Sequence, residues 1–284
     1  MTTFGQRLTG ALDAHGALCV GIDPHESLLS VWGLDASADG VREFGLRVVE
    51  AAVGRVGIVK PQVAFFEQYG SGGFAALEDV MAEARAAGLI VIADAKRGDI
   101  GSTMAGYATA WLAPGSPLET DAVTLSPYLG PDSLDQTLKT ALRHRKGAFV
   151  LAATSNPEAL PVQTAIVVDD AALEGQRVAE RVARDIGWMN MGLPGALGSL
   201  GVVIGATVDR KAYGLTDMVL AGTPILAPGF GAQGAEPADV ARLFGYVAGN
   251  VIANESRSIL SVGRDRLADR IAERAALYRG ADRG

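Results

Sequence analysis

Short apolar runs recur along the chain, and each is followed by polar residues, glycine or proline. The runs are too continuously apolar for strands with one face in water, and they are typical of parallel strands covered on both sides. The pattern predicts eight strands, at residues 18–23, 57–62, 89–94, 122–126, 149–154, 202–207, 224–228 and 259–263.

Between these runs, apolar residues recur at steps of three and four, which predicts amphipathic helices. We expect such helices at residues 40–54, 75–87, 172–186, 237–247 and 265–278. Eight strands that alternate with helices over about 250 residues predict an α/β fold of the (β/α)8 TIM-barrel type. A doubly wound sheet is the alternative, because it uses the same alternation.

No long linker or change of composition divides the chain, so residues 1–284 are expected to form a single barrel domain. The connection between the fifth and sixth predicted strands, about residues 156–201, is unusually long and is expected to hold an extended segment. The glycine-rich end of this connection, residues 191–201, predicts a loop.

Composition narrows the classes of function. A hydrophobic content of 49% supports a large core, and a formal net charge of −7 argues against nucleic acid or an anionic membrane as partner. Cys19 is the only cysteine, and His15, His25 and His144 lack the spacing of a zinc site, so no metal site is expected. Neither a signal peptide nor an apolar run of about 20 residues that could span a bilayer is present. A cytoplasmic protein is therefore expected.

The strongest chemical signal is the charged segment that follows the third apolar run. Asp94 and Lys96 lie two residues apart, so on a strand they point the same way. Gly98 then permits a sharp turn before Asp99. Charges at the end of a buried strand are costly unless they pair or do chemistry. The alternative is an ordinary ion pair at a strand exit, worth about 0–1 kcal/mol.

In a TIM barrel the active site lies at the carboxyl ends of the strands, so polar residues just after different runs should meet there. These residues are Asp23, Lys60, Asp94, Lys96, Asp99, Ser126, Thr154, Ser155, Gln233 and Arg264.

The glycine-rich turn after the seventh run predicts a phosphate site. Gly231 and Gly234 let backbone N–H groups approach an anion, and Arg264, after the eighth predicted strand, adds a guanidinium. The spacing of Gly229, Gly231 and Gly234 also matches a dinucleotide fingerprint, but it lies too late in the chain and lacks the first-strand βαβ context.

Together these residues resemble a known family, orotidine 5′-phosphate decarboxylase, in its longer bacterial branch. Asp94, Lys96 and Asp99 resemble its Asp-x-Lys-x-x-Asp signature. The other residues that match its pattern, in the same order along the chain, are Asp23, Lys60, Thr103, Ser155, Gln233 and Arg264. The resemblance implies a barrel homodimer in which Asp99 and Thr103 enter the partner's active site.

The resemblance also implies the reaction, which removes the C6 carboxylate of orotidine 5′-monophosphate and gives uridine 5′-monophosphate and CO₂. No cofactor is implied, so fixed charges must stabilise the carbanion at C6. Lys96 is implied to be the cation beside C6 and its proton donor. Asp94 and Asp99 would keep Lys60 and Lys96 protonated and in place.

Three other functions remain open from the residues alone. Lys96 could form a Schiff base with a sugar-phosphate carbonyl, as in an aldolase, although flanking carboxylates keep an amine protonated and non-nucleophilic. A related barrel branch uses a metal to stabilise an enediolate. A non-catalytic protein that binds nucleotide phosphates is the third alternative, but binding alone does not need this array of charges.

Overall fold

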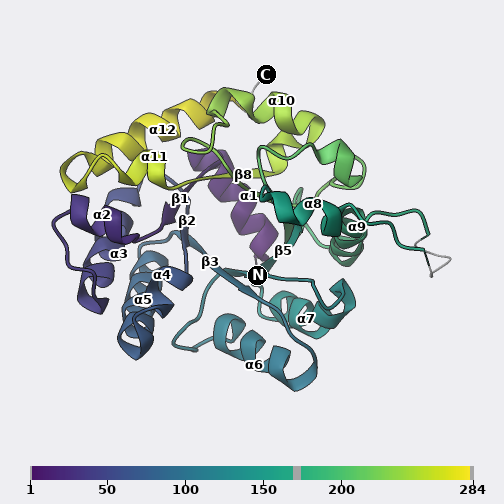
Figure 1. Ribbon diagram of the computed structural model, residues 1–284, viewed down its shortest axis with the longest axis horizontal. Coiled ribbons are helices and arrows are strands. Elements are labelled where there is room, and N and C mark those ends of the chain that lie inside the picture. Colours follow the sequence, from purple (N-terminus) through teal and green to yellow (C-terminus); the bar gives the residue numbers. More distant parts are fainter. Residues whose placement is uncertain (1, 169–173, 282–284) are drawn as a thin grey trace.

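The computed structural model describes residues 2–168 and 174–281. Eight parallel strands close into a barrel in chain order, and helices surround it (Figure 1). The predicted TIM barrel is therefore confirmed. The strands are β1 (Leu18–Ile22), β2 (Ile58–Pro61), β3 (Ile90–Arg97), β4 (Ala122–Leu125), β5 (Gly147–Ala153), β6 (Leu200–Ile204), β7 (Ile225–Pro228) and β8 (Val251–Glu255).

Two of the long helices, α1 and α3, begin at residues whose side chains cap them. The Ser37 side chain accepts a hydrogen bond from the Gly40 N–H and so caps α3, whose buried face packs on the barrel. The α-helices are α1 (Phe4–His15), α2 (Glu26–Val31), α3 (Ala38–Ala52), α4 (Ala64–Glu67), α5 (Gly70–Ala86), α6 (Gly101–Leu112), α7 (Asp135–Arg143), α8 (Leu160–Gln163), α9 (Val178–Asn190), α10 (Val240–Phe244), α11 (Arg257–Leu260) and α12 (Leu267–Ala281). The 3₁₀ helices are η1 (Pro131–Leu134), η2 (Pro157–Ala159), η3 (Arg210–Tyr213), η4 (Pro237–Asp239), η5 (Gly245–Asn250) and η6 (Arg264–Arg266).

The predicted eighth strand is wrong. Residues 259–263 form the end of α11 and the turn after it, and Ile259 and Leu260 are buried there as helix residues. Strand β8 lies earlier in the chain and pairs with both β1 and β7, which closes the barrel. Periodicity cannot distinguish a short buried helix from a buried strand, and the apolar part of β8 is short because the strand ends in Asn254 and Glu255.

The connection between β5 and β6 contains η2, α8 and α9. The helix predicted at residues 172–186 begins at Val178 in the described part of the chain, and residues 172–173 lie outside the described residues. The predicted loop at 191–201 ends where β6 begins at Leu200. The helix predicted at 237–247 is divided among η4, α10 and η5.

The barrel interior has an apolar half and a polar half. Cys19, Ile58, Ile92 and Ile252 fill the amino-terminal half together with other strand residues, and α1 packs across this end through Phe4 and its neighbours. Figure 1 shows α1 crossing the middle of the ring. Burial raises the pKa of the Cys19 thiol to about 12, so it is neutral at physiological pH. Inside the barrel, the polar side chains of Lys60, Asp94 and Asn254 lie toward the carboxyl ends of the strands.

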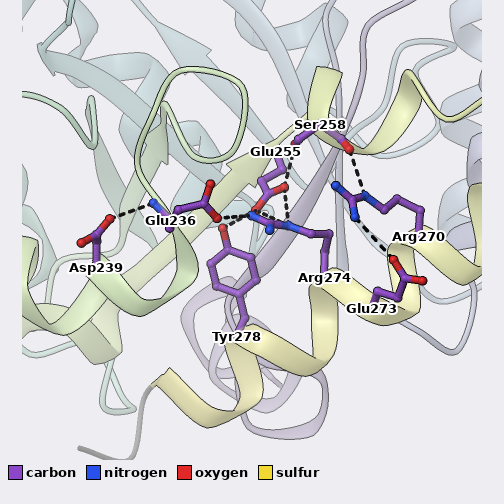
Figure 2. A network of polar contacts seen from close by, with 8 residues as sticks. All are labelled: Glu236, Asp239, Glu255, Ser258, Arg270, Glu273, Arg274 and Tyr278. Carbon is purple, nitrogen blue, oxygen red and sulfur yellow. Dashed lines mark hydrogen bonds and ion pairs between the residues drawn. The ribbon is translucent and has the colours of Figure 1, made fainter.

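A buried carboxylate ties β8 to the last helix. Glu255 is fully buried and accepts hydrogen bonds from the Arg274 guanidinium, the Tyr278 hydroxyl at 2.6 Å and the Ser258 hydroxyl at 2.7 Å. Figure 2 shows Arg274 also reaching Glu236, in the segment that follows β7. A buried carboxylate with this many donors is compensated, and the cluster joins β8, α11 and α12.

We predict that Tyr278→Phe lowers the free energy of unfolding by about 2 kcal/mol, because it removes one hydrogen bond to a buried charge. Burial, with Glu255 beside it, raises the pKa of the Tyr278 hydroxyl above its ordinary value. The hydroxyl therefore keeps its proton and donates a hydrogen bond at every pH at which the protein is handled. Urea unfolding measures the loss. Tyr246→Phe is the control, because Tyr246 is 98% exposed and its substitution should change nothing. Equal stability of the two variants would show that the Tyr278 hydrogen bond contributes nothing.

Candidate active site at the carboxyl end of the barrel

A cavity of about 470 Å³ opens at the carboxyl ends of the strands. Its lining comes from seven of the eight strands or the segments that follow them, so no single element builds it. The polar residues of the lining are Asp23, Lys60, Gln62, Asp94, Lys96, Thr154, Ser155, Asn156, Gln233, Asn254, Ser256 and Arg257.

Two lysines share one carboxylate at the floor of this cavity. The Lys60 Nζ lies 2.8 Å from Asp94 Oδ2, and the Lys96 Nζ lies 2.6 Å from Asp94 Oδ1. The Lys60 side chain is only 4% exposed, whereas that of Lys96 is 45% exposed. Lys60 is thus locked in the wall, and Lys96 presents its ammonium to whatever enters.

The ionisation of this cluster follows from its contacts. Burial alone would raise the pKa of Asp94, but the charges and hydrogen bonds of Lys60 and Lys96 outweigh it and hold that pKa well below its usual range. Burial likewise would lower the pKa of Lys60, but Asp94 raises it above its ordinary value. Asp94 is therefore a carboxylate and Lys60 an ammonium throughout the neutral range.

An irregularity in the backbone of β3 brings Asp94 and Lys96 together. The pairing of β3 with β4 shifts register between Ala93 and Arg97, so β3 contains extra residues here. Lys96 has a φ of 47°, in the left-handed region that non-glycine residues rarely adopt. The two side chains do meet, as the sequence predicts, but at an irregularity rather than on a regular extended strand.

Three buried polar atoms that line the cavity have no hydrogen-bond partner within the described part of the chain. They are Asp23 Oδ1, Asn254 Oδ1 and Ser256 Oγ. An unpaired buried polar atom costs about 1–3 kcal/mol. The residues that carry these atoms line the cavity, so the cost falls on its wall.

Most of the predicted site residues lie together in this cavity. Besides Lys60, Asp94 and Lys96, they are Asp23, Ser155 and Gln233. The Ser155 segment is held by α8, because the Gln163 side chain accepts a hydrogen bond from the Thr154 N–H at 2.8 Å and donates one to the Thr154 hydroxyl at 3.0 Å.

Six predicted residues lie outside the cavity lining: Asp99, Thr103, Ser126, Gly231, Gly234 and Arg264. Asp99 and Thr103 are at the start of α6, outside the cavity lining, and Thr103 is exposed. Neither Gly231 nor Gly234 lines the cavity. Their N–H groups are used within the turn, because Gly231 donates to the Ala235 carbonyl and Gly234 to the Gly231 carbonyl. A β-carbon on Gly231 would lie 2.3 Å from Ser258 Oγ, so this glycine is required for packing against α11.

The prediction that Arg264 lies at the cavity is wrong, because it depended on the wrongly predicted eighth strand. Arg264 begins η6, lies beside Asp265 and lines a separate surface hollow with residues of α3. Arg257, two residues after β8, occupies the cavity instead.

Several lining residues escaped the sequence analysis. Asn254, Ser256 and Arg257 were missed with β8, although a short apolar run, residues 251–253, followed by four polar residues was a usable signal. Gln62 and Asn156 were missed because single amides after a strand carry little information. No group of three or more His, Cys, Asp or Glu side chains placed to hold a metal occurs among the described residues. Within those same residues, no helix is long and apolar enough to cross a membrane.

The fold and the cavity define a TIM-barrel enzyme with a lysine–aspartate–lysine cluster at its mouth. Comparison with known proteins identifies the family: residues 16–268 match the Orotidine 5′-phosphate decarboxylase / HUMPS family. The chain belongs to this family, and its reaction is the decarboxylation of orotidine 5′-monophosphate to uridine 5′-monophosphate.

Individual relatives cover almost the whole chain. The orotidine 5′-phosphate decarboxylase of Corynebacterium glutamicum is 48% identical over 283 residues, which are 99% of each chain. That of Streptomyces coelicolor is 49% identical over 273 residues, covering 96% of this chain and 95% of the relative. The structure of the Leishmania donovani OMP decarboxylase superposes with a TM-score of 0.75 at 29% identity, covering 99% of this chain and all of the other.

Proposed function

We propose that Lys96 is the catalytic cation and acid of the decarboxylation. The bond between C6 and the carboxylate breaks, CO₂ leaves, and the electron pair remains at C6. The Lys96 ammonium then transfers a proton to C6, and the neutral amine regains a proton from solvent. The observation that carries this proposal is the position of Lys96, which is held by Asp94 at 2.6 Å yet faces the cavity.

Simple electrostatics sets how much Lys96 can lower the activation barrier of the decarboxylation. Opposite unit charges about 4 Å apart gain roughly 4 kcal/mol at an effective dielectric of 20. Enzymes lower activation barriers by up to about 23 kcal/mol in the ordinary range. One lysine is therefore insufficient, and the fixed array of Lys60, Asp94 and Lys96 together with remote binding energy supplies the remainder.

Arg257 and Gln233 hold the phosphate in this proposal. Both line the cavity, on segments that follow the neighbouring strands β8 and β7. This is the end of a TIM barrel where phosphate commonly binds. Asp23 and Asn254, with their unpartnered buried oxygens, lie in the wall that takes the ribose hydroxyl groups. Ser155 contacts the base.

The chain acts as a homodimer in which Asp99 and Thr103 complete the partner's active site. What supports this is their position outside the cavity of their own chain. The adjacent loops expose Ile100, Tyr128 and Leu129, an apolar group that a partner would cover. These loops are in contact, because the Ser126 N–H donates to the Arg97 carbonyl at 2.8 Å.

Subunit mixing tests the shared site. Lys96→Ala and Asp99→Ala homodimers should each be inactive, but a mixed dimer has one site with neither substitution. Co-refolding equal amounts should therefore restore about a quarter of the wild-type activity, measured as the fall in ultraviolet absorbance while orotidine 5′-monophosphate is consumed. If no activity returns although mass spectrometry demonstrates mixed dimers, Asp99 acts in its own chain's site. An active Asp99→Ala homodimer would show that Asp99 belongs to no site. Refolding Lys96→Ala with itself is the control.

Three further proposals complete the assignment. The chain forms one domain, functions in the cytoplasm, and uses neither cofactor nor metal. Nucleic acid and membranes are not partners, which agrees with the net charge of −7. An aldolase mechanism is disfavoured by the same geometry that supports the decarboxylase, since the Lys96 Nζ is engaged by Asp94 at 2.6 Å, whereas a Schiff base needs an amine free to attack a carbonyl.

A further inference from the structure

A buried threonine on the neighbouring strand contacts the backbone of Lys96 and the carboxylate that holds its ammonium. Thr124 lies in β4 and is 1% exposed. Its hydroxyl oxygen lies 2.9 Å from the Lys96 backbone nitrogen, which donates to it, and 2.9 Å from Asp94 Oδ1. Asp94 Oδ1 is the same atom that receives the Lys96 ammonium at 2.6 Å. These three hydrogen bonds form a ring that the side chain of Lys96 itself closes.

The register shift explains why this contact is needed. Between Ala93 and Arg97 the strand β3 advances four residues, whereas β4 advances two, from Val123 to Leu125. The backbone ladder therefore has no regular place for the Lys96 N–H, and the Thr124 side chain accepts its hydrogen bond. The left-handed φ of 47° at Lys96 needs such support, because strained backbone persists only where its surroundings hold it.

The direction of the hydrogen bonds follows from the chemistry of a hydroxyl. Thr124 Oγ1 carries one proton and accepts from the Lys96 N–H, so that proton is free to go to the carboxylate of Asp94. Serine could make the same two bonds, whereas valine, of nearly the same shape, could make neither.

We propose that Thr124 is a positioning residue for Lys96. It does not line the cavity, so it acts through the strained backbone of Lys96 and through the carboxylate that orients the ammonium. The inference rests on the proposed role of Lys96. Because misplacing a reacting group by about 1 Å can lower a rate 100-fold, loss of the Thr124 hydroxyl should act on the chemical step and not on substrate binding.

The test compares Thr124→Val with Thr124→Ser. Thr124→Val should lower kcat about 10- to 100-fold, while the KM for orotidine 5′-monophosphate and the Kd for uridine 5′-monophosphate stay within about twofold of wild type. Thr124→Ser should recover kcat to within about threefold of wild type. If Thr124→Val does not fold, Thr124→Ala, which is smaller and also lacks the hydroxyl, takes its place.

A matched control separates positioning from general stability. Thr120 is also fully buried, just before β4, and its hydroxyl donates to the Val91 carbonyl at 2.8 Å, away from the cavity. Thr120→Val should lower the thermal midpoint without lowering kcat. A wild-type kcat in Thr124→Val, or an equal loss of kcat in Thr120→Val, would overturn the proposal.

A double variant distinguishes failure of this inference from failure of the role of Lys96. If Thr124 acts only through Lys96, adding Thr124→Val to Lys96→Ala should produce no further loss of activity. A fully active Lys96→Ala would remove the proposed function of that residue. If Lys96→Ala is inactive but Thr124→Val is fully active, only the proposed role of Thr124 is refuted.

Discussion

Lys96→Ala is expected to lower kcat by about 10⁵-fold or more while the protein remains folded. Removing the cation forfeits roughly 4 kcal/mol of carbanion stabilisation, which is about three orders of magnitude in rate. Removing the proton donor costs a further 10²- to 10⁴-fold, as is typical of general acid catalysis. The loss should appear in kcat rather than in KM, since the cation acts on charge that develops only in the transition state.

The fold should tolerate this substitution. Asp94 retains its contacts with Lys60 at 2.8 Å and with Thr124 at 2.9 Å, and the Lys96 side chain is half exposed. The measurement is the ultraviolet assay of orotidine 5′-monophosphate consumption, with circular dichroism to verify folding. Lys139→Ala is the control, because Lys139 is exposed and paired only with Asp135 on its own helix, so activity should not change. Lys96→Ala turnover within tenfold of wild type would eliminate Lys96 as the acid.

Arg257→Ala should raise KM for orotidine 5′-monophosphate and lower kcat/KM by about 30- to 5000-fold. Truncating a guanidinium that pairs with a phosphate within a pocket typically costs about 2–5 kcal/mol of binding free energy. Part of the loss should also fall on kcat, because binding energy from the phosphate is used to position the base. Steady-state kinetics over a wide range of substrate concentration separates the two effects.

Arg264→Ala is the matched control for this prediction. It removes the same group seven residues further along the chain, at the surface beside Asp265 and outside the cavity. Its kinetics should equal those of wild type. A large KM increase in Arg264→Ala together with an unchanged Arg257→Ala would reverse the assignment and restore the arginine that the sequence alone favours.

The alternation of apolar runs and amphipathic helices was sufficient to predict the barrel, because parallel strands buried on both faces need continuous apolar sequence. The charged segment at Asp94 and Lys96 could be recognised from the sequence because it directly ends such an apolar run, where charged residues are exceptional. Lys60 and Asp23 were found because they directly follow other apolar runs, and in a closed barrel all strands end at one mouth.

Other features depend on neighbours that are remote in sequence. Only tertiary pairing with β1 and β7 identifies Val251–Glu255 as the last strand, and Arg257 rather than Arg264 follows from it. The N–H of Gly231 is used inside its own turn, which composition cannot reveal.

The sequence by itself thus determined the fold class, the family and the residues that carry charge at the mouth, because these depend on local polarity and on order along the chain. The tertiary structure alone decided which arginine lines the cavity and which threonine supports Lys96. Those assignments depend on strand register, and register is set by pairing between strands that are far apart along the chain.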